Sequence, residues 1–339
     1  MSRPAAPVSV VIPTRNRPGE VARLLERLAG QTYRPAEILI VDASQPPLDV
    51  HRVQPLCAPI PLQVIGCRPH LCVQKNLGLQ KAAQPFVWLC DDDMDPPAAY
   101  LERLWRYLQA HPEVPAASGL VLEPAGEGRF QSQFPDTLPA LLWKFCFQLS
   151  VWGPLPRPRR KAARVLWAPI VRWYRRRGNS WTLAGWPLIT RWDEPVVHTA
   201  FYGLGACMVR RQALPEDPFP AWLDPYGIGD NYGLALNLPF PPGIAVLTDL
   251  PILHRKSQEN RLGEGEKFAR RLQALVRFVR EGDRFARLNR IWLGWSLVGL
   301  WLQARRSGNR GQQKAIRTAF RALFLPPPGD DATARSTEG

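Results

Sequence analysis

The sequence lacks the features that mark several common classes of protein. None of its six cysteines forms a CxxC pair, so neither a zinc framework nor a disulfide framework is expected. The longest apolar run, 291–302, has twelve residues, whereas a helix that crosses a bilayer needs about 20. No internal repeat is visible, and Ser2, Arg3 and Pro4 lead into a strand pattern without a leader segment. These absences predict a cytoplasmic protein without a spanning helix.

Positive charge is concentrated in two segments. The net charge is +15, from 44 basic and 29 acidic residues. Segments 157–177 and 284–325 each carry nine Arg or Lys and no acidic residue, so the rest of the chain holds slightly more acidic than basic residues. Both segments also contain Trp, Leu and Ile. This mixture favours an anionic membrane surface over a solvated helix face, which is the usual explanation of a single charged run.

The order of the apolar segments predicts an α/β fold. Short apolar runs typical of buried strands occupy 8–13, 36–42, 61–66, 85–90 and 243–253. Helical patterns follow the first, third and fourth of these runs. Strands that alternate with helices form a mostly parallel, Rossmann-like sheet with right-handed crossovers and helices on its faces.

Polar clusters follow three of these predicted strands. Residues 13–17 follow the first strand, Asp42 ends the second, and 91–93 follow the fourth. Ligands of such sheets bind beyond the carboxyl ends of the strands. Because three clusters far apart in the sequence meet at that edge, they predict one ligand site there.

Three consecutive carboxylates, Asp91, Asp92 and Asp93, follow a fully apolar strand. They would raise each other's pKa by repulsion unless a cation is near. Carboxylate oxygens, completed by water and substrate phosphates, are the ligands that magnesium and manganese prefer. An exposed acidic turn or a helix N-cap is the alternative, and it explains Asp95 equally well. For Asp91 and Asp93 the apolar strand favours a metal site.

Four segments, taken in order, resemble glycosyltransferase family 2. They are VSVVIPTRNRP (8–18), QTYRPAEILIVDAS (31–44), QKNLGL (74–79) and VWLCDDDMDP (87–96). The resemblance covers about 8–125, and extends more loosely over 199–260. It implies the GT-A fold and an enzyme that moves a sugar from a nucleotide diphosphate to a hydroxyl group in one inverting step. It also implies a divalent metal, manganese or magnesium.

The resemblance further implies which residues bind the donor and the metal. The donor nucleotide would meet Pro13, Thr14, Arg15, Asn16, Asp42, Lys75, Asn76, Asp91 and Asp92. Asp91 and Asp93 match the metal-binding DxD motif, and His254, at another strand end, would complete the metal site.

Two of these assignments leave alternatives open. Many family members have a second acid where this chain has Ala43, so the nucleotide base is not determined. The pair Lys75 and Asn76 is explained equally well as an ordinary helix face.

The family's general base lies in a Glu-Asp pair that opens a helix after an acceptor loop. The matching segment is YGIGDNYGLAL (226–236), in which Asp230 holds the first position and Asn231 the second. Because Asn cannot act as a base, we expect Asp230 in this role; a shift by one residue and a helix N-cap are the alternatives. The acceptor or diphosphate would lie near Gly205, Ala206, Asn231, Arg255 and Lys256.

The resemblance and the composition together predict how the chain is divided into domains. A GT-A catalytic domain is expected over 1–260, with a nucleotide-binding half at 8–125, an insertion rich in Trp and Arg at 123–198, and an acceptor-side half at 199–260. Residues 261–325 are expected to form helices that associate with a membrane. The tail, 326–339, has almost no large apolar residue and is expected to be disordered.

The basic apolar segments predict where the enzyme works. Segment 288–306 is apolar in its middle and basic at its ends, which suits a helix in the membrane interface with Trp292, Trp295 and Trp301 at headgroup level. A packed helix or an oligomer contact is the alternative. With the similar segment 165–177, it predicts a peripheral enzyme on the cytoplasmic face, with a saccharide or lipid-linked acceptor in polysaccharide or glycolipid synthesis.

Three other functions compete with this hypothesis. A nucleotidyltransferase would normally show a glycine-rich loop after the first strand, where this chain has only Gly19. A nucleic-acid-binding protein would fit the net charge, but no recognised motif is present and the acidic edge of the sheet opposes it. A non-catalytic, nucleotide-sugar-binding family member is suggested by Ala43 and Asn231.

Overall fold

The computed structural model of the chain describes residues 3–126, 128–257, 259 and 262–325. The predicted disordered tail, 326–339, lies outside the described residues. The chain folds as two units: the first holds 1–141, 150–181 and 187–261, and the second holds 142–149, 182–186 and 262–339. Each unit is described separately below.

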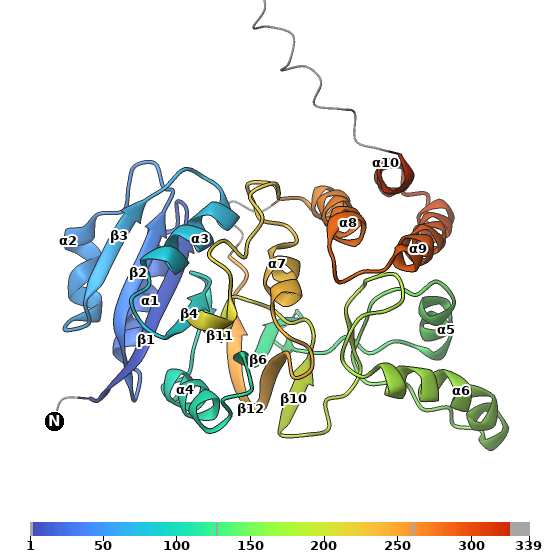
Figure 1. Ribbon diagram of the computed structural model, residues 1–339, viewed down its shortest axis with the longest axis horizontal. Coiled ribbons are helices and arrows are strands. Elements are labelled where there is room, and N and C mark those ends of the chain that lie inside the picture. Colours follow the sequence, from blue (N-terminus) through green and yellow to red (C-terminus); the bar gives the residue numbers. More distant parts are fainter. Residues whose placement is uncertain (1–2, 127, 258, 260–261, 326–339) are drawn as a thin grey trace, which may run out of the picture. The chain divides into compact units, whose positions relative to one another are not determined.

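The first unit is built on one large mixed sheet (Figure 1). Its strands are β1 (Ala5–Thr14), β2 (Arg34–Asp42), β3 (Leu62–Gly66), β4 (Phe86–Cys90), β5 (Met94–Asp95), β6 (Ala116–Pro124), β7 (Phe130–Gln131), β10 (Val196–Thr199), β11 (Ala206–Arg210) and β12 (Ile244–His254). The strand order is β10-β12-β6-β11-β4-β1-β2-β3, with β5 beside β12 and β7 beside β6.

Along the main order of eight strands, four of the seven neighbouring pairs run parallel. β1 is parallel to β2 and β4, β2 to β3, and β12 to β6. β11 is antiparallel to both β4 and β6, and β10 is antiparallel to β12. The predicted α/β fold with a mostly parallel sheet is therefore confirmed. The strand predicted at 8–13 begins earlier, at Ala5, and the other four predicted strands agree with the observed ones within two residues.

The helices of the first unit lie between its strands along the chain. They are α1 (Pro18–Ala29), α2 (Val50–Val53), α3 (Leu71–Lys81), α4 (Tyr100–Ala110), α6 (Lys161–Arg177) and α7 (Asp230–Asn237); a 3₁₀ turn covers Gln54–Cys57 and another Arg211–Ala213. A small second sheet pairs β8 (Val151–Trp152) with β9 (Leu188–Ile189). Helix α5 (Leu138–Cys146) crosses the boundary between the units.

Close contact between α3 and the sheet depends on Gly78. A Cβ atom at this position would lie 2.2 Å from a methyl carbon of Val11 in β1, so only glycine lets the helix approach so closely. α3 therefore lies directly against β1 and β2, whose carboxyl ends stand in register at Thr14 and Asp42. This packing brings the polar residues of α3 to the edge where those strands end.

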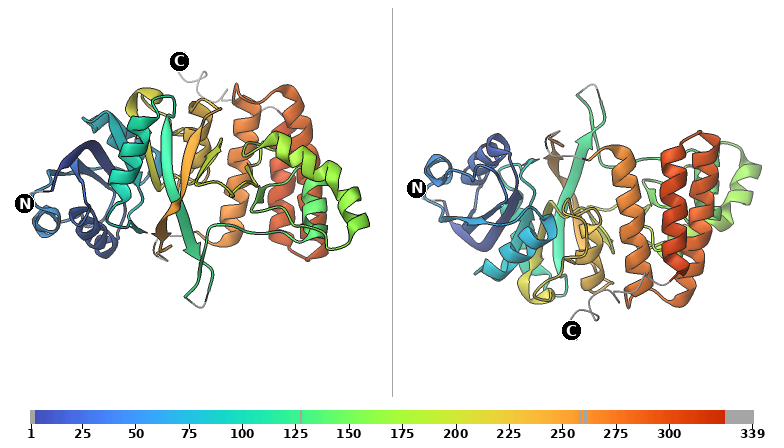
Figure 2. Two further views of the ribbon diagram at one scale, coloured as in Figure 1. Left: turned by 90° about the horizontal axis from the view of Figure 1, so that it is seen from below. Right: turned by 90° about the horizontal axis from the view of Figure 1, so that it is seen from above.

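The second unit consists mainly of three helices, α8 (Glu264–Glu281), α9 (Arg287–Arg306) and α10 (Arg310–Phe324). Figure 2 shows them side by side, and each helix has buried apolar residues, such as Leu275, Leu297 and Ile316. Trp186 donates a hydrogen bond of 2.7 Å from Nε1 to Ser296 Oγ in α9. In the part of the chain that the structure describes, no helix is long and apolar enough to span a membrane.

Candidate active site

The polar clusters at the strand ends meet as the sequence predicts. Thr14 ends β1 beside Asp42 of β2, and β4 leads directly into Asp91. Gln74 of α3 joins the first two ends, because its Nε2 donates to the carbonyl oxygens of Thr14 (2.9 Å) and Val41 (2.8 Å). The edge of the sheet is thus held by a buried side chain that the sequence analysis did not select.

Asp92 is buried and is held by two residues at the end of β1 and in the loop that follows it. Thr14 Oγ1 donates to its Oδ2 at 2.8 Å, and Arg17 contacts its Oδ1 at 2.9 Å. Burial raises the pKa of Asp92 to about 6, although Arg17 and Thr14 act in the opposite direction. Arg17 also lies 3.9 Å from Asp93 and donates to the carbonyl oxygen of Glu259. Asp92 therefore anchors the β1 loop to the aspartate cluster.

Lys75 links Asp91 to Asp230. Its ammonium group lies 2.6 Å from Asp230 Oδ2 and 3.6 Å from Asp91 Oδ1, and the lysine side chain is almost fully buried. Burial alone would lower the pKa of Lys75, but the two carboxylates outweigh burial and raise it. Residues from α3, the β4 loop and α7 are therefore joined in one ionic group.

Asp230 is the first residue of α7, and Gly229 is the N-cap with a φ of 105°. That left-handed conformation favours glycine and turns the chain so that Asp230 faces Lys75. The N-cap alternative for Asp230 is therefore wrong by one residue. The carboxylate is fixed by two donors, because Oδ1 accepts the backbone N–H of Asn231 at 2.8 Å and Oδ2 accepts Lys75.

Asp93 pairs with His254 at the end of β12. The distance from Asp93 Oδ1 to His254 Nε2 is 3.2 Å, and the backbone N–H of Ser257 donates to Asp93 Oδ2 at 3.1 Å. On the other side of the imidazole, His254 Nδ1 lies 3.9 Å from Glu123, and Lys256 contacts the same glutamate at 2.8 Å. Glu123, which has no motif around it, was not selected from the sequence.

The pair Asp93 and His254 fits a divalent cation. Two cis ligands at about 2.1 Å from one ion stand about 3 Å apart, which is close to the observed 3.2 Å. Asp91, with a third of its side chain exposed, can contribute a further oxygen. Nevertheless, among the described residues no group of three or more His, Cys, Asp or Glu is already gathered as a metal site. The residues therefore fit such an ion as a pair, with Asp91 as the third candidate.

Most of the other predicted donor-binding residues contact the chain's own backbone. Asp42 accepts the N–H groups of Ser44 (2.9 Å) and Leu48 (2.7 Å), which shapes the loop after β2. Asn16, with a φ of 55°, accepts the N–H of Gln45 at 2.8 Å. These contacts join the loops after β1 and β2 beside Pro13 and Arg15, where the donor nucleotide is predicted.

Asn76 is placed differently from Lys75. Its amide exchanges two hydrogen bonds with the backbone of Phe219, at 2.8 and 3.1 Å. Asn76 thus holds the segment that leads to α7. The direct nucleotide contact that the resemblance implies for Asn76 stays a prediction.

The predicted acceptor-side residues lie against the aspartate cluster. Gly205 accepts the N–H of Asp91 at 3.0 Å, and a Cβ atom on Gly205 would lie 2.2 Å from Asp91 Oδ2. Ala206 follows in β11 and pairs with Cys90. Asn231 accepts the N–H of Leu204 at 3.2 Å. This strand therefore has to carry a small residue where it passes the Asp91 carboxylate.

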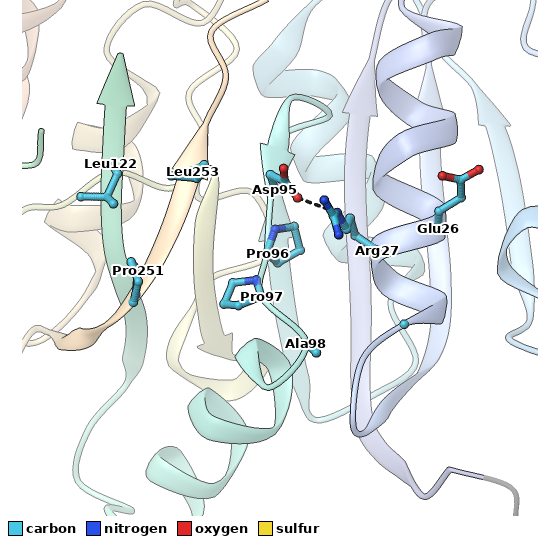
Figure 3. A pocket seen from close by; sticks show the side chains of 10 residues that line it. Glu26, Arg27, Asp95, Pro96, Pro97, Ala98, Leu122, Pro251 and Leu253 are labelled. Atoms are coloured by element: carbon cyan, nitrogen blue, oxygen red, sulfur yellow. Dashed lines mark ion pairs between the residues drawn. The ribbon is translucent and has the colours of Figure 1, made fainter. Parts of the chain in front are cut away.

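Arg255 turns away from the cluster and toward Asp95. It lies 2.6 Å from Asp95, which also pairs with Arg27 of α1 at 2.7 Å. Asp95 belongs to β5, and Ala99 is the residue that precedes α4, so an N-cap role for Asp95 is wrong. Figure 3 shows Arg27 directed at Asp95.

Arg27 and Asp95 also line a cavity of about 480 Å³. The other residues that line it are Glu26, Gly30, Pro96, Pro97, Ala98, Leu122, Pro251 and Leu253.

Comparison with protein families gives matches to parts of the chain. Residues 9–150 match the family model described as Glycosyl transferase family 2. An uncharacterized glycosyltransferase, YwdF of Bacillus subtilis (strain 168), is 35% identical over 89 residues, which are 25% of this chain and 32% of YwdF. The chain thus spans about a third of the length of this curated relative. Both matches confirm the resemblance and agree with the predicted class of enzyme.

Solved structures support the fold. The structure of S. aureus TarS 1-349 in complex with UDP-GlcNAc aligns over 93% of this chain and 81% of its own, with a TM-score of 0.54 and 17% identity. A mannosyltransferase from Pyrobaculum calidifontis, PcManGT with GDP-Man and Mn²⁺, aligns over 95% of this chain and 82% of its own, with a TM-score of 0.47 and 16% identity. The TarS likeness agrees with the predicted GT-A fold, and the second is too distant to add to it.

Proposed function

We propose that this chain, which matches glycosyltransferase family 2 over residues 9–150, transfers a sugar from a nucleotide diphosphate to a hydroxyl group. One observation supports this most strongly: Lys75 lies within 3.6 Å of Asp91 and 2.6 Å of Asp230. The lysine thereby connects the predicted donor side with the predicted base, although Asp91 and Asp230 lie far apart in the sequence. If residues 91–93 formed only a structural acidic turn, this ionic link between Asp91 and Asp230 would be unexplained.

Asp230 is proposed as the general base. It would accept the proton of the acceptor hydroxyl while that oxygen attacks the anomeric carbon from the face opposite the leaving diphosphate, so the reaction inverts the configuration. Lys75 donates a hydrogen bond to Oδ2 of Asp230, and the backbone N–H of Asn231 donates one to Oδ1. These two hydrogen bonds fix the plane of the carboxylate. Lone pairs remain on both oxygens to receive the proton.

Asp91, Asp93 and His254 are proposed to hold manganese or magnesium. When bound, such an ion offsets the negative charge that develops on the leaving diphosphate. The chain itself fixes Asp93 through the backbone N–H of Ser257. It also holds the two proposed metal-ligand atoms, Asp93 Oδ1 and His254 Nε2, 3.2 Å apart. Lys75, close to Asp91, adds a fixed positive charge at the same place.

The donor nucleoside is proposed to lie on the loops after β1 and β2. Thr14, Arg15 and Asn16 belong to the first loop, and Asp42 shapes the second by accepting two backbone N–H groups. TarS was solved with UDP-GlcNAc, which makes this donor the first to test here.

The acceptor is proposed to be a saccharide or a lipid-linked saccharide of a cell-envelope polysaccharide or glycolipid, at the cytoplasmic face of the membrane. The support comes from composition: nine basic and no acidic residues at 157–177, and again at 284–325, next to Trp and Leu. On α6 the side chains of Val165 and Leu166 are among the most exposed apolar groups.

The test is release of free nucleoside diphosphate by the purified full-length chain. Wild type would be incubated with manganese, a panel of nucleotide sugars and membrane lipid extract as acceptor source, in parallel with Asp93→Ala and Asp230→Asn. Asp249→Asn is the matched control, because this exposed aspartate pairs with Arg103 and lies outside the site. Release from one donor, lost in the two site variants and retained in the control, is expected.

Three results would contradict the proposal. Release of pyrophosphate in place of nucleoside diphosphate would identify a nucleotidyltransferase. Donor binding without turnover with every acceptor would identify a non-catalytic protein. Retention of the donor's anomeric configuration in the product, measured by NMR, would overturn the inverting step and the role of Asp230 as its base.

A further inference from the structure

Helices α9 and α10 carry an exposed apolar surface. Its main side chains, called the α9–α10 face below, are Leu288, Ile291, Trp295, Leu302, Phe320 and Phe324. Leu288 and Ile291 are 67% and 63% exposed, which is unusual for large aliphatic side chains on a folded helix. Exposed apolar groups that gather in one patch mark an interaction site.

The face is continuous across the two helices. Leu288, Ile291, Trp295 and Leu302 follow at intervals of three, four and seven residues, so they line one side of α9, while Leu293 and Leu297 on the other side are buried. Phe324 extends the surface from α10, since a Cβ atom on Gly294 of α9 would lie 2.8 Å from its ring. The rings of Phe320 and Phe324 are 5.0 Å apart.

Trp295 is held with part of its ring outward. Its indole Nε1 donates to the carbonyl oxygen of Cys146 at 2.8 Å, and its ring stacks on Phe147 at 4.9 Å, yet 46% of the residue stays exposed. A tryptophan fixed in this way keeps its apolar surface available without the entropy cost of ordering it on binding.

The charges around the face are mainly positive. Segment 284–325 contains no acidic residue, and Lys314, Arg317 and Arg321 of α10 are exposed beside the two phenylalanines. Two of the acids of α8, Glu266 and Glu281, form ion pairs with arginines of their own helix, and Asp283 is an exposed acid just before the segment. The face therefore presents apolar groups framed by an excess of positive charge.

We propose that the α9–α10 face is the docking site of this enzyme on an anionic lipid bilayer, with both helices lying in the interface. Aliphatic and aromatic side chains enter the acyl boundary, and the arginine and lysine heads reach the lipid phosphates along their flexible stems. Anionic lipid matches this excess of positive charge better than a protein surface, which carries both signs. The inference rests on the proposed function only in that a lipid-linked acceptor gives the docking its purpose.

The experiment is co-sedimentation of the full chain with vesicles of phosphatidylcholine, with and without one third phosphatidylglycerol. Binding is expected only with the anionic lipid, and should weaken as salt is raised. Arg317→Gln/Arg321→Gln should lower the partition coefficient about 30-fold, and Leu288→Gln/Ile291→Gln at least about 10-fold. Arg52→Gln and Phe130→Ser, exposed residues outside α9 and α10, are matched controls and should bind as wild type.

Three results would overturn the proposed docking site. Equal binding to neutral and anionic vesicles, or unchanged binding by both double variants, would overturn the proposal. So would sedimentation velocity showing that Leu288→Gln/Ile291→Gln turns a dimer into a monomer while vesicle binding stays intact, since the face would then be a contact between two copies. Nucleoside diphosphate release measured without lipid tests the proposed function separately, so each failure can be recognised.

Discussion

The candidate active site and the C-terminal helices differ in how their charges are balanced. In the site, Asp92 pairs with Arg17, Asp93 with His254 and Asp230 with Lys75, mostly out of contact with solvent. In α9 and α10 the basic side chains are largely exposed, and no acid occurs between 284 and 325. Charge balanced inside the fold fixes a geometry, whereas charge left unbalanced at the surface is solvated by water and stays available to a partner.

This difference predicts very different costs of substitution in the two regions. Removal of one member of a buried pair leaves an uncompensated charge, while removal of an exposed charge leaves solvent in its place. The following predictions test the contrast, from the largest expected effect to the smallest.

Lys75→Met should have the largest effect on stability. It leaves Asp230 and Asp91 without their shared cation in a buried position, which should lower the free energy of unfolding by about 3–5 kcal/mol in urea titrations. The double variant Lys75→Met/Asp230→Asn should recover part of this loss, because the unpaired carboxylate is gone. Additive effects of the two substitutions would show that the 2.6 Å contact is not energetically coupled.

Asp92 should make stability depend on pH. Its pKa is raised from 3.8 to about 6, chiefly by burial, so the folded chain holds the proton more tightly than the unfolded chain. That stabilisation is complete below pH 3.8 and is lost as the pH rises through about 6. With EDTA present, wild type should lose about 3 kcal/mol relative to Asp92→Asn over this interval. A difference that stays constant with pH would contradict the account.

Gly205→Ala should have an intermediate effect. The new Cβ atom would lie 2.2 Å from Asp91 Oδ2 and 2.7 Å from Met94 Cε, so the loop after β4 must shift. We expect a loss of about 1–3 kcal/mol in thermal unfolding and weaker manganese binding, because Asp91 moves. Gly203→Ala is the matched control, since nothing lies within 4 Å of a Cβ atom there. Equal effects of the two substitutions would contradict the close approach.

Arg317→Gln/Arg321→Gln should have the smallest effect on the fold. Both side chains belong to exposed residues of α10, so the free energy of unfolding should stay within about 0.5 kcal/mol of wild type. Nucleoside diphosphate release without lipid should also be unchanged. A large loss of either would mean that these arginines belong to the folded core or to the active site, and that the contrast between the two regions fails.

The sequence predicts the framework of the site because strand ends are local features. The apolar run before Asp91, the acid at the end of β2 and the PTRN segment after β1 each mark a strand that ends at the ligand edge, and the register of Thr14 with Asp42 agrees. The alternation of strands and helices likewise predicts the α/β fold.

The pairings within the site could not be predicted, because they join distant segments. Lys75 and Asp230 are 155 residues apart, and Glu123 approaches His254 only because β6 and β12 are neighbours. Arg17 stands in the predicted loop, but its contact with Asp92 depends on how α1 begins. The order of the strands in the sheet decides which acidic side chain pairs with which basic side chain. Local sequence patterns do not reveal that order.

Metal-dependent nucleotide binding is the most direct test of the central claim that this edge of the sheet holds a nucleotide diphosphate. UDP and GDP would be titrated calorimetrically into the full chain, with manganese or with EDTA, and into Asp93→Ala with manganese. The account predicts binding of at least one nucleotide with manganese, and a loss of affinity of at least about 10-fold in EDTA and in Asp93→Ala. Equal affinity under all three conditions, or no binding of either nucleotide, would contradict it.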